Sequence, residues 1–406
     1  MRTVHSGVWR PADRAASRYH YRPVDVPPGA RSLRVELAFD RSAGVLDLGL
    51  FDPAGRFRGY SGGARDAFAV GETVATPGYL PGPLPAGSWQ VLLGLHRIPA
   101  AGLAWSVTAE SSRGRGNSGL VSDPRVSTIA GRAAPGRRPR DLPVPAGMRW
   151  LAGDLHAHTV HSDGALTVGE LAALAADGGL DFLAVTDHNT VSHHPELAAT
   201  SGIVLVPGQE VTTDRGHANA FGPVDWVDFR RPPDDWLSTV DAAGGLLSVN
   251  HPLAGDCAWL MPMTGRPPLA EVWHSGWWDR TWGAPLAWLL AWAPDAVAVG
   301  GSDFHRLSDS ERPGRPTTWV AAAEPSVAGI LDGLRAGRTA IGADPDGPVL
   351  LRVEDRVVAV DADGTLLVDL TGRRRPVNGD RAEFVPAPDP GPVWLEDGNA
   401  RILAIT

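Results

Sequence analysis

Short apolar runs alternate with helical stretches between residues 150 and 343, and this alternation constrains the fold more than any other feature. The runs predict strands, and the stretches between several of them predict helices. Such alternation favours a parallel sheet, and so many units predict closure into a barrel. The expected strands are 150–158, 182–186, 203–209, 218–221, 246–249, 269–273, 297–300 and 319–322. The expected helices are 168–176, 235–243, 285–292 and 326–336.

The flanking segments have a different pattern. Residues 1–110 contain short alternating runs separated by Gly/Pro turns, which predicts a small all-β sandwich. Residues 111–149 are rich in Gly, Pro and Arg, as linkers are. Residues 344–406 return to β-like runs, which fit either a small β module or an appendage that completes the sandwich. We therefore expect an α/β protein with a β-rich region at each end of the barrel domain.

Composition excludes several classes of protein. Acidic residues number 46 against 37 basic ones, and a formal net charge of −9 disfavours a general nucleic-acid binder. Because Cys257 is the one cysteine, no intrachain disulfide forms, and we interpret it as a packed thiol. We find neither the apolar stretch of a secretory signal near residue 1 nor a run of about 18 apolar residues. We expect a cytoplasmic protein without a membrane partner, whose oligomeric state the sequence leaves open.

Histidines and acids gather where the expected strands end. His156 and His158 lie two residues apart after the first strand, so their side chains point the same way, and Asp303 and His305 repeat that spacing. In a parallel barrel the carboxyl ends of all strands open on one face. The other candidate ligands near expected strand ends are Asp163, His188, Glu210, His217 and His251.

This set predicts a metal centre. Burying so many ionisable groups without a metal would cost several kcal/mol each. Imidazole and carboxylate ligands suit Zn, Mn or Fe better than Ca or Mg. The set exceeds what one ion needs, and Glu210 is placed to bridge, so we expect two or three divalent transition-metal ions.

The ordered blocks DLHAHTVHSDG, TDHNT, GQE, GHANAFG, NHP and GSDFH resemble the motifs of the PHP (polymerase and histidinol phosphatase) metallohydrolases over about residues 150–343. The blocks GHANAFG and EVWHSGWW, with the preceding β domain, resemble its CehA/McbA branch, named for carbamate hydrolases. The resemblance implies a distorted seven-stranded (β/α) barrel that holds up to three ions.

The resemblance also implies an allocation of ligands. It gives the first ion His156, His158, Glu210 and Asp303. It gives the second ion bridging Glu210 with His217 and His251, and the third ion Asp163, His188 and His305. Asp154 and Asp187 are expected to orient imidazoles from behind. His274 stands where the branch usually has asparagine.

These expectations lead to a hydrolase. Hydroxide held between two ions near neutral pH would attack a phosphoester, with His188 or Asp303 as the possible general acid. Candidate substrate-binding residues are Arg215, His274, Arg306 and Arg338. The Trp-rich stretch 273–292 supports the alternative, a carbamate or carboxylic-ester hydrolase that uses the same ions. Either would take a small-molecule ester. A non-catalytic binding protein is the distant alternative, against which the intact ligand set argues.

Overall fold

The computed structural model describes residues 1–114, 140–385 and 391–406, so most of the expected linker lies outside the described residues. Contacts divide the chain into two compact units. The first comprises Met1–Ser127 with two short segments, Thr159–Thr167 and Asp187–Pro195. The second comprises Thr128–His158, Val168–Thr186 and Glu196–Thr406. None of the described helices combines the length and the apolar character that crossing a membrane requires.

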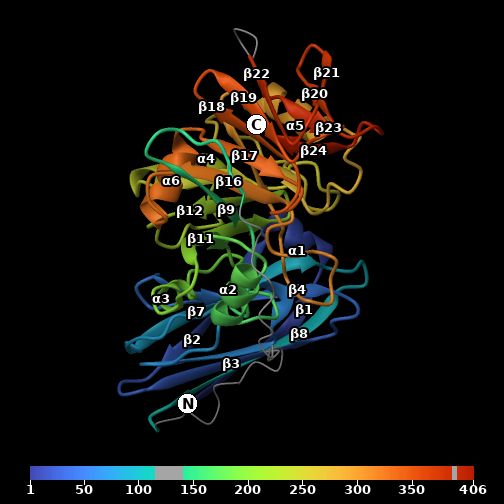
Figure 1. Cartoon of the computed structure of the whole chain (residues 1–406). Helices are drawn as coiled ribbons and strands as arrows, with labels where there is room; N and C mark the ends of the chain where they lie inside the picture. The colour runs from blue at the N-terminus through green and yellow to red at the C-terminus, as the bar shows by residue number, and fades with distance from the viewer. Residues whose placement is uncertain (115–139, 386–390) are drawn as a thin grey trace. The chain divides into compact units, whose positions relative to one another are not determined.

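The first unit is built on two antiparallel sheets of four strands each, in the orders β1-β8-β3-β6 and β2-β7-β4-β5 (Figure 1). In β3 the inward Leu33, Val35 and Leu37 are buried while the intervening Arg34 and Glu36 are more exposed, as expected for a half-buried strand. The elements are β1 (Arg2–Trp9), α1 (Pro11–Ala16), β2 (Tyr19–Val26), β3 (Ser32–Phe39), β4 (Val45–Phe51), β5 (Phe57–Tyr60), the 3-10 turn η1 (Gly62–Ala64), β6 (Ala67–Gly71), β7 (Gly87–Arg97) and β8 (Leu103–Ser112).

The elements that follow belong mainly to the second unit, which is rich in sheet and has few helices. They are β9 (Arg149–Asp154), α2 (Val168–Asp177), β10 (Phe182–Val185), α3 (His194–Leu197), β11 (Val204–Thr213), β12 (Gly216–Phe221), α4 (Pro233–Ala242), β13 (Leu246–Val249), β14 (Leu269–His274), α5 (Ala284–Trp292), β15 (Val297–Gly301), β16 (Thr317–Ala322), α6 (Val327–Arg335) and β17 (Thr339–Gly342). The C-terminal strands are β18 (Val349–Val353), β19 (Arg356–Val360), β20 (Leu366–Val368), β21 (Arg374–Pro376), β22 (Arg381–Phe384), β23 (Trp394–Glu396) and β24 (Ile402–Ile405).

The large sheet of this unit differs from the expected parallel barrel. Its order is β15-β14-β13-β12-β11-β10-β9-β16-β17-β24-β23-β20-β21. The pairs β9–β10, β10–β11, β13–β14 and β14–β15 are parallel, but β12 is antiparallel to both of its neighbours. The reason is the short turn Asp214–Arg215, which makes β11 and β12 a hairpin and leaves no room for a crossover helix.

No continuous ladder closes this sheet among the described residues. An isolated parallel bridge joins Ala157, beyond β9, to Phe304, beyond β15. In addition, the Gly300 N–H donates to Thr318 Oγ1 on β16 at 2.8 Å, and that hydroxyl donates back to Gly300 O. The sheet therefore approaches closure through single contacts, and the closed, distorted (β/α)7 barrel that the resemblance implies is not formed by a continuous ladder among the described residues.

The mixed directions still bring the predicted ligands to one edge. His156 and His158 follow the carboxyl end of β9, and Glu210 lies in β11, parallel to β10. His217 is the second residue of β12, and because β12 runs antiparallel to β11, His217 pairs with Thr212 near the end of β11. An antiparallel strand thus contributes its first residues where parallel strands contribute their last.

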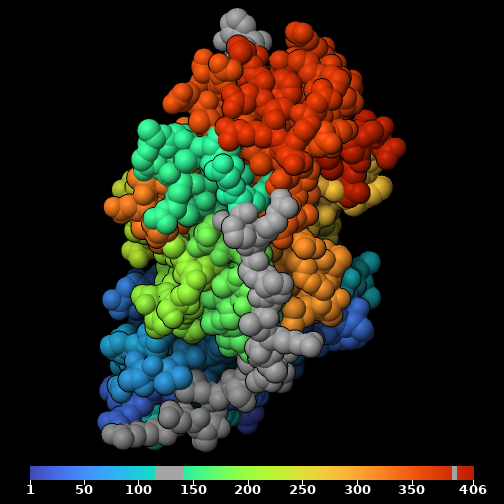
Figure 2. Space-filling model, viewed as in Figure 1, coloured from blue at the N-terminus to red at the C-terminus, as the bar shows by residue number. Residues whose placement is uncertain are grey.

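The C-terminal residues join the second unit and do not complete the sandwich of the first. Ile405 of β24 pairs with Ile341 of β17, so the large sheet continues into this region, while β18, β19 and β22 form a separate small sheet. Arg140 lies against this region, with its guanidinium 2.8 Å from Asp361 and donating to Pro345 O at 3.1 Å. Figure 2 shows the blue-green residues 140–148 beside the orange and red C-terminal surface.

Candidate metal centre

His156 is a fully buried imidazole of the centre, and a carboxylate contacts its ring on the side away from the other predicted ligands. Its side chain is fully buried, and Nδ1 lies 3.0 Å from Oε1 of Glu271. Gly301 makes this packing possible, since a Cβ there would lie 2.5 Å from the Cβ of His156 and 2.3 Å from Glu271 Oε1. The carboxylate fixes the Nδ1–H tautomer and turns the lone pair of Nε2 to the opposite side.

That lone pair faces two more carboxylates. Nε2 of His156 lies 3.2 Å from Glu210 Oε1 and 3.2 Å from Asp303 Oδ1, yet within the described part of the chain it has no hydrogen bond of acceptable geometry. In the neutral ring, this lone pair and the two carboxylate oxygens form a suitable cradle for a divalent cation, which would displace the proton that the metal-free ring carries on Nε2. The donor set of His156, His158 and Asp303, whose ligand atoms lie within 4.8 Å of one another, therefore fits a transition-metal ion.

Glu210 connects this group to a second one. Its Oε1 lies 3.1 Å from Nδ1 of His217 and 3.4 Å from Nε2 of His251, while Oε2 lies 3.6 Å from Nε2 of His158. Asn250 Nδ2 donates to the same Oε1 at 2.9 Å and steadies the carboxylate. A buried carboxylate between two histidine groups is suited to bridge two ions.

Backbone strain accompanies two of these ligands. His251 and Asp303 have φ values of +27° and +52°, which side chains other than glycine rarely adopt. Such conformations persist where the surrounding structure holds them, and they cluster at functional sites. Cys257, interpreted as a packed thiol, is partly buried with its Sγ 3.5 Å from Nδ1 of His251.

His274 contacts the centre through Asp303. Its Nδ1 accepts the backbone N–H of Gly276 at 2.9 Å, so the ring proton sits on Nε2, 3.1 Å from Asp303 Oδ2. His274 therefore donates to the oxygen of Asp303 opposite the one that faces His156 and His158. It positions a predicted ligand, and it also lines the pocket described below.

The charged groups of the centre shift one another's pKa values towards the ionised forms. Burial opposes protonation of His156, but Asp303, Glu210 and Glu271 together raise its pKa well above the usual value. Burial acts to raise the pKa of Asp303, yet the charge of His156 and the hydrogen bonds from His158 and His274 hold it well below the usual value. The lowered pKa of Asp303 leaves it ionised near neutral pH in the metal-free chain, which favours His188 over Asp303 as the predicted general acid.

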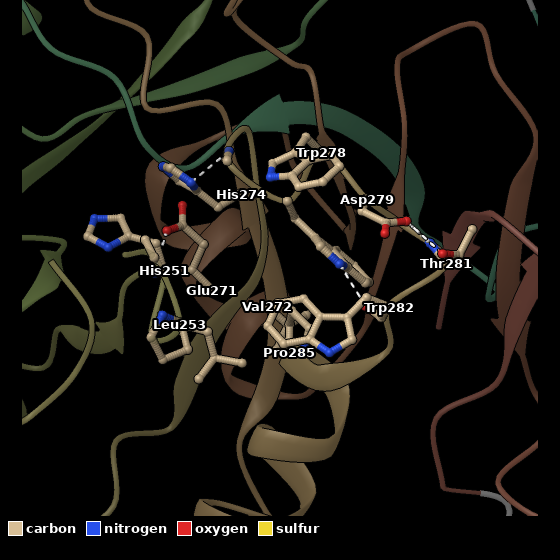
Figure 3. Close-up of a pocket in the computed structure, with 14 residues that line it drawn as sticks. His251, Leu253, Glu271, Val272, His274, Trp278, Asp279, Thr281, Trp282 and Pro285 are labelled. Carbon is tan, nitrogen blue, oxygen red and sulfur yellow. Dashed lines mark hydrogen bonds between the residues drawn. The ribbon is translucent and has the colours of Figure 1, made fainter. Parts of the chain in front are cut away.

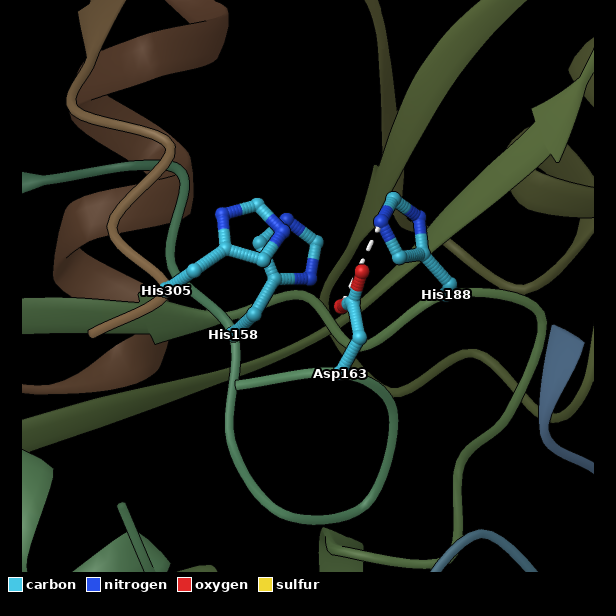
Figure 4. A group of neighbouring side chains, drawn as sticks. All are labelled: His158, Asp163, His188 and His305. Atoms are coloured by element: carbon cyan, nitrogen blue, oxygen red, sulfur yellow. Dashed lines mark ion pairs between the residues drawn. The ribbon is translucent and has the colours of Figure 1, made fainter. Parts of the chain in front are cut away.

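The third predicted group is divided between the units. Asp163 and His188 belong to the first unit, where Oδ1 and Nε2 lie 3.6 Å apart (Figure 4). His305 belongs to the second unit, and its ring stacks on that of His158 with centroids 4.3 Å apart. The third ion therefore stays a prediction from the sequence.

Asp154 supports the backbone of three segments, and Asp187 lies beside a buried histidine. Asp154 Oδ1 accepts the N–H groups of His156 and Ser302 at 3.0 Å, and Oδ2 accepts that of Gly314 at 2.8 Å. Burial raises the pKa of Asp154 although these hydrogen bonds act to lower it. Asp187 lies 3.1 Å from His193, a buried histidine that is not a predicted ligand.

The arginines predicted to bind substrate are engaged elsewhere. Arg338 lies at the other end of the sheet, because its Nε donates to Ala321 O and Ala321 pairs with Trp150 at the start of β9. Its assignment to the substrate is therefore wrong. Arg215 donates to Leu260 O at 2.8 Å, and Arg306 lies 3.6 Å from Asp309.

Sequence reasoning overlooked Glu271. This residue joins two ligand-bearing segments, since Oε1 contacts His156 and Oε2 accepts the backbone N–H of His251 at 2.9 Å. The available signal was a lone carboxylate inside the strand LAEVWH, whose other residues are apolar up to His274. A charged residue in a fully buried strand calls for a partner.

A pocket of about 470 Å³ opens beside the centre. His251, Glu271 and His274 lie at one end of it and the tryptophan-bearing segment after β14 at the other (Figure 3). Trp278 and Trp282 are 83% and 54% exposed, which is unusual for such large apolar side chains. The side chains lining this pocket include no arginine.

Comparisons with known proteins give partial likenesses. No protein-family model matches the chain. A 65-residue stretch is 42% identical to the 5'-3' exoribonuclease Rnm of Salmonella typhimurium, and this match spans 15% of the chain and 22% of that enzyme. A two-domain protein from Bacteroides vulgatus, described as containing a predicted PHP-like metal-dependent phosphoesterase, is 18% identical with a TM-score of 0.40, over 68% of this chain and 91% of that one. An amidohydrolase from Chromobacterium violaceum is 18% identical with a TM-score of 0.32, over 39% and 89%.

Proposed function

We propose that the chain is a metal-dependent hydrolase of the PHP type that cleaves small-molecule phosphoesters. The observation that carries the proposal is the position of His156 Nε2 between the carboxylates of Glu210 and Asp303, with Glu271 behind the ring. This arrangement supports the proposal, because histidines that bind metals commonly donate their other ring N–H to a carboxylate. The CehA/McbA branch is part of the same proposal and is supported by the sequence blocks alone.

Each residue near the ions has a distinct task. His156, His158 and Asp303 would hold one ion, His217 and His251 a second, and Glu210 would bridge them. The bound ions would activate water and neutralise charge on the substrate oxygens. Glu271 and Asn250 keep His156 and Glu210 in place, His274 holds the outer oxygen of Asp303, and His188 is the candidate proton donor to the leaving group.

Charge favours a phosphoester. Two divalent ions would bring four positive charges against the three carboxylates of Glu210, Glu271 and Asp303, all of which are at least partly buried. With neutral water as the remaining ligand, the centre would carry one excess positive charge in a region of low dielectric, where an anionic group is attracted. The ions can thus replace the arginines that the sequence suggested for this task.

A carbamate or carboxylic ester is the second candidate, and the pocket favours it. Trp277, Trp278 and Trp282 line one wall, and no cationic side chain other than histidine lines the described pocket. An uncharged aromatic alcohol fits these surroundings better than a sugar or a second phosphate. The two candidates use the same ions and differ in the group that is attacked.

The first experiment measures metal content by elemental analysis beside hydrolysis of three substrates. These are p-nitrophenyl phosphate, bis-p-nitrophenyl phosphate and 1-naphthyl N-methylcarbamate, with a short single-stranded RNA as a fourth arm. We expect two or three ions per chain and turnover of a phosphoester. Glu210→Gln should lose metal and lower kcat/KM by more than about 100-fold, which exceeds the usual effect of an outer-shell substitution. The exposed Glu72→Gln is the matched control.

Each outcome has a separate meaning. Turnover of the carbamate alone selects the second candidate, and RNA cleavage alone contradicts the small-molecule proposal. A folded, metal-free and inactive chain after loading with Zn²⁺ or Mn²⁺ contradicts both candidates, as does a Glu210→Gln variant with full metal and activity.

A further inference from the structure

Asp163 and His188 lie on two short segments that the first unit includes, together with its β sandwich. Thr159–Thr167 carries Asp163 and Asp187–Pro195 carries His188. Both are loops that follow strands of the second unit along the chain. Their contacts with the sandwich show what holds them.

Arg65 forms two hydrogen bonds to the first loop, Thr159–Thr167. It follows η1 in the sandwich, and its side chain is buried. Its Nη1 donates to Ser162 O at 3.0 Å and its Nη2 donates to Val160 O. The planar guanidinium fork fixes two carbonyls two residues apart, which a flexible ammonium could not do equally well. Asp163 is the next residue along the chain.

Gly78 forms two hydrogen bonds to the second loop, Asp187–Pro195. Its N–H donates to Ser192 Oγ at 3.0 Å, and its carbonyl accepts from Thr190 Oγ1 at 2.9 Å. Gly78 has φ +96°, and a Cβ there would lie 2.8 Å from the carbonyl oxygen of His161. Only glycine permits this approach, by which one turn of the sandwich contacts both loops.

The two loops are also bonded to each other. Asp187 accepts the Thr159 N–H at 2.8 Å and the hydroxyls of Thr159 and Ser162 at 2.6 Å. His161 Nδ1 lies 2.8 Å from Ser192 Oγ, the same oxygen that accepts from Gly78. Sandwich and loops therefore form one hydrogen-bonded assembly, with Asp163 and His188 each directly following one of its members.

We propose that Arg65 and Gly78 are positioning residues, through which the β sandwich fixes Asp163 and His188 for a third metal ion. The inference rests on the proposed function, because that proposal supplies the metal ions. The other predicted ligands lie in the second unit, and among them His158 adjoins this assembly, since it directly precedes Thr159.

The test uses the full chain and counts ions. Wild type, Arg65→Met, Arg65→Lys and the surface control Arg34→Met, whose partner is the exposed Glu36, are loaded with excess Zn²⁺, desalted and analysed for metal and for near-UV circular dichroism. We expect three ions per chain for wild type and control and two for Arg65→Met, with the folded spectrum kept. Arg65→Lys should recover the third ion only in part, since one ammonium cannot span both carbonyls.

If Arg65→Met fails to fold, a milder substitution, Ser192→Ala, tests the inference. Ser192→Ala removes the hydroxyl that Gly78 and His161 share, and we expect the Kd of the third ion to rise roughly 10-fold, measured by competition with a chelator. Unchanged stoichiometry in Arg65→Met, or unchanged affinity in Ser192→Ala, overturns the inference. Two ions in wild type also overturn it while leaving the proposed function intact, whereas no ions in wild type overturn the proposed function itself.

Discussion

At the scale of single residues, Glu271 contacts two predicted ligands, His156 and His251, directly. Its carboxylate accepts from the His251 backbone and orients the His156 ring. Glu271→Gln keeps the shape but removes the charge, so we predict a 10- to 100-fold loss of metal affinity, roughly the usual effect of an outer-shell change. Chelator competition measures it, with Glu72→Gln as control. Equal affinities in the two variants would contradict the role.

His274 offers a second residue-scale prediction. His274→Ala removes the donor to Asp303 Oδ2, and we expect about 10-fold weaker metal binding, with partial recovery in His274→Gln because the amide N–H can donate. The control is His5→Ala, which changes a partly exposed histidine of the sandwich whose Nε2 lies 2.8 Å from Pro23 O. If His274→Gln binds metal as weakly as His274→Ala, the ring contributes by packing rather than by its hydrogen bond to Asp303.

The shifted pKa values of His156 and Asp303 predict how the metal-free chain responds to pH. The pKa of His156 is raised on folding, so it stabilises the fold fully below its unfolded value of about 6.5, and this is lost as pH rises through the folded value. The pKa of Asp303 is lowered, so its contribution is present above about 3.9 and is lost as pH falls through the folded value.

Urea unfolding in EDTA tests this prediction at pH 6 and pH 9. We expect lower stability at pH 9, and a smaller difference in His156→Gln. Metal affinity should change in the opposite direction, because an ion must displace the proton of His156. A metal-free chain equally stable at both values would contradict the assignment.

At the scale of elements, β15 depends on the absence of a side chain at Gly301. The Gly301→Ala methyl would lie 2.3 Å from Glu271 Oε1 and 2.5 Å from the Cβ of His156. We predict a loss of about 1–3 kcal/mol in the free energy of unfolding, together with weaker metal binding. Gly255→Ala, with open space around its Cβ, is the control in urea titrations. A variant as stable as that control would contradict the close packing.

The strands were largely predictable from the sequence, but their directions were not. The expected 246–249 and 297–300 correspond to β13 (Leu246–Val249) and β15 (Val297–Gly301). Apolar runs indicate where buried strands lie, but they do not indicate whether neighbouring strands are parallel or antiparallel. The hairpin of β11 and β12 was missed because its two-residue turn, Asp214 with Arg215, lacks the Asn-Gly or Asp-Gly signal. The convergence of ligands followed from strand ends, whereas Glu271 lay within a strand and escaped notice.

At the scale of the whole molecule, the sequence located the β-rich ends but not their attachments. The choice between a separate module and part of the sandwich depended on β24 pairing with β17, a contact between residues distant in the chain. Composition marked residues 111–149 as a connector, yet Arg140 lies against Asp361 with its side chain almost fully buried. Local pattern describes how a segment folds, and long-range pairing decides what it joins.

The chain alternates between the two units at several points, because the segments Thr159–Thr167 and Asp187–Pro195 belong with the sandwich although neighbouring residues do not. A chain that lacks residues 1–114 would therefore keep these two loops but lose the sandwich residues that hold them. We therefore expect an exchange of the N-terminal region with that of another chain to succeed only when Arg65, Gly78 and both loops are transplanted as one set.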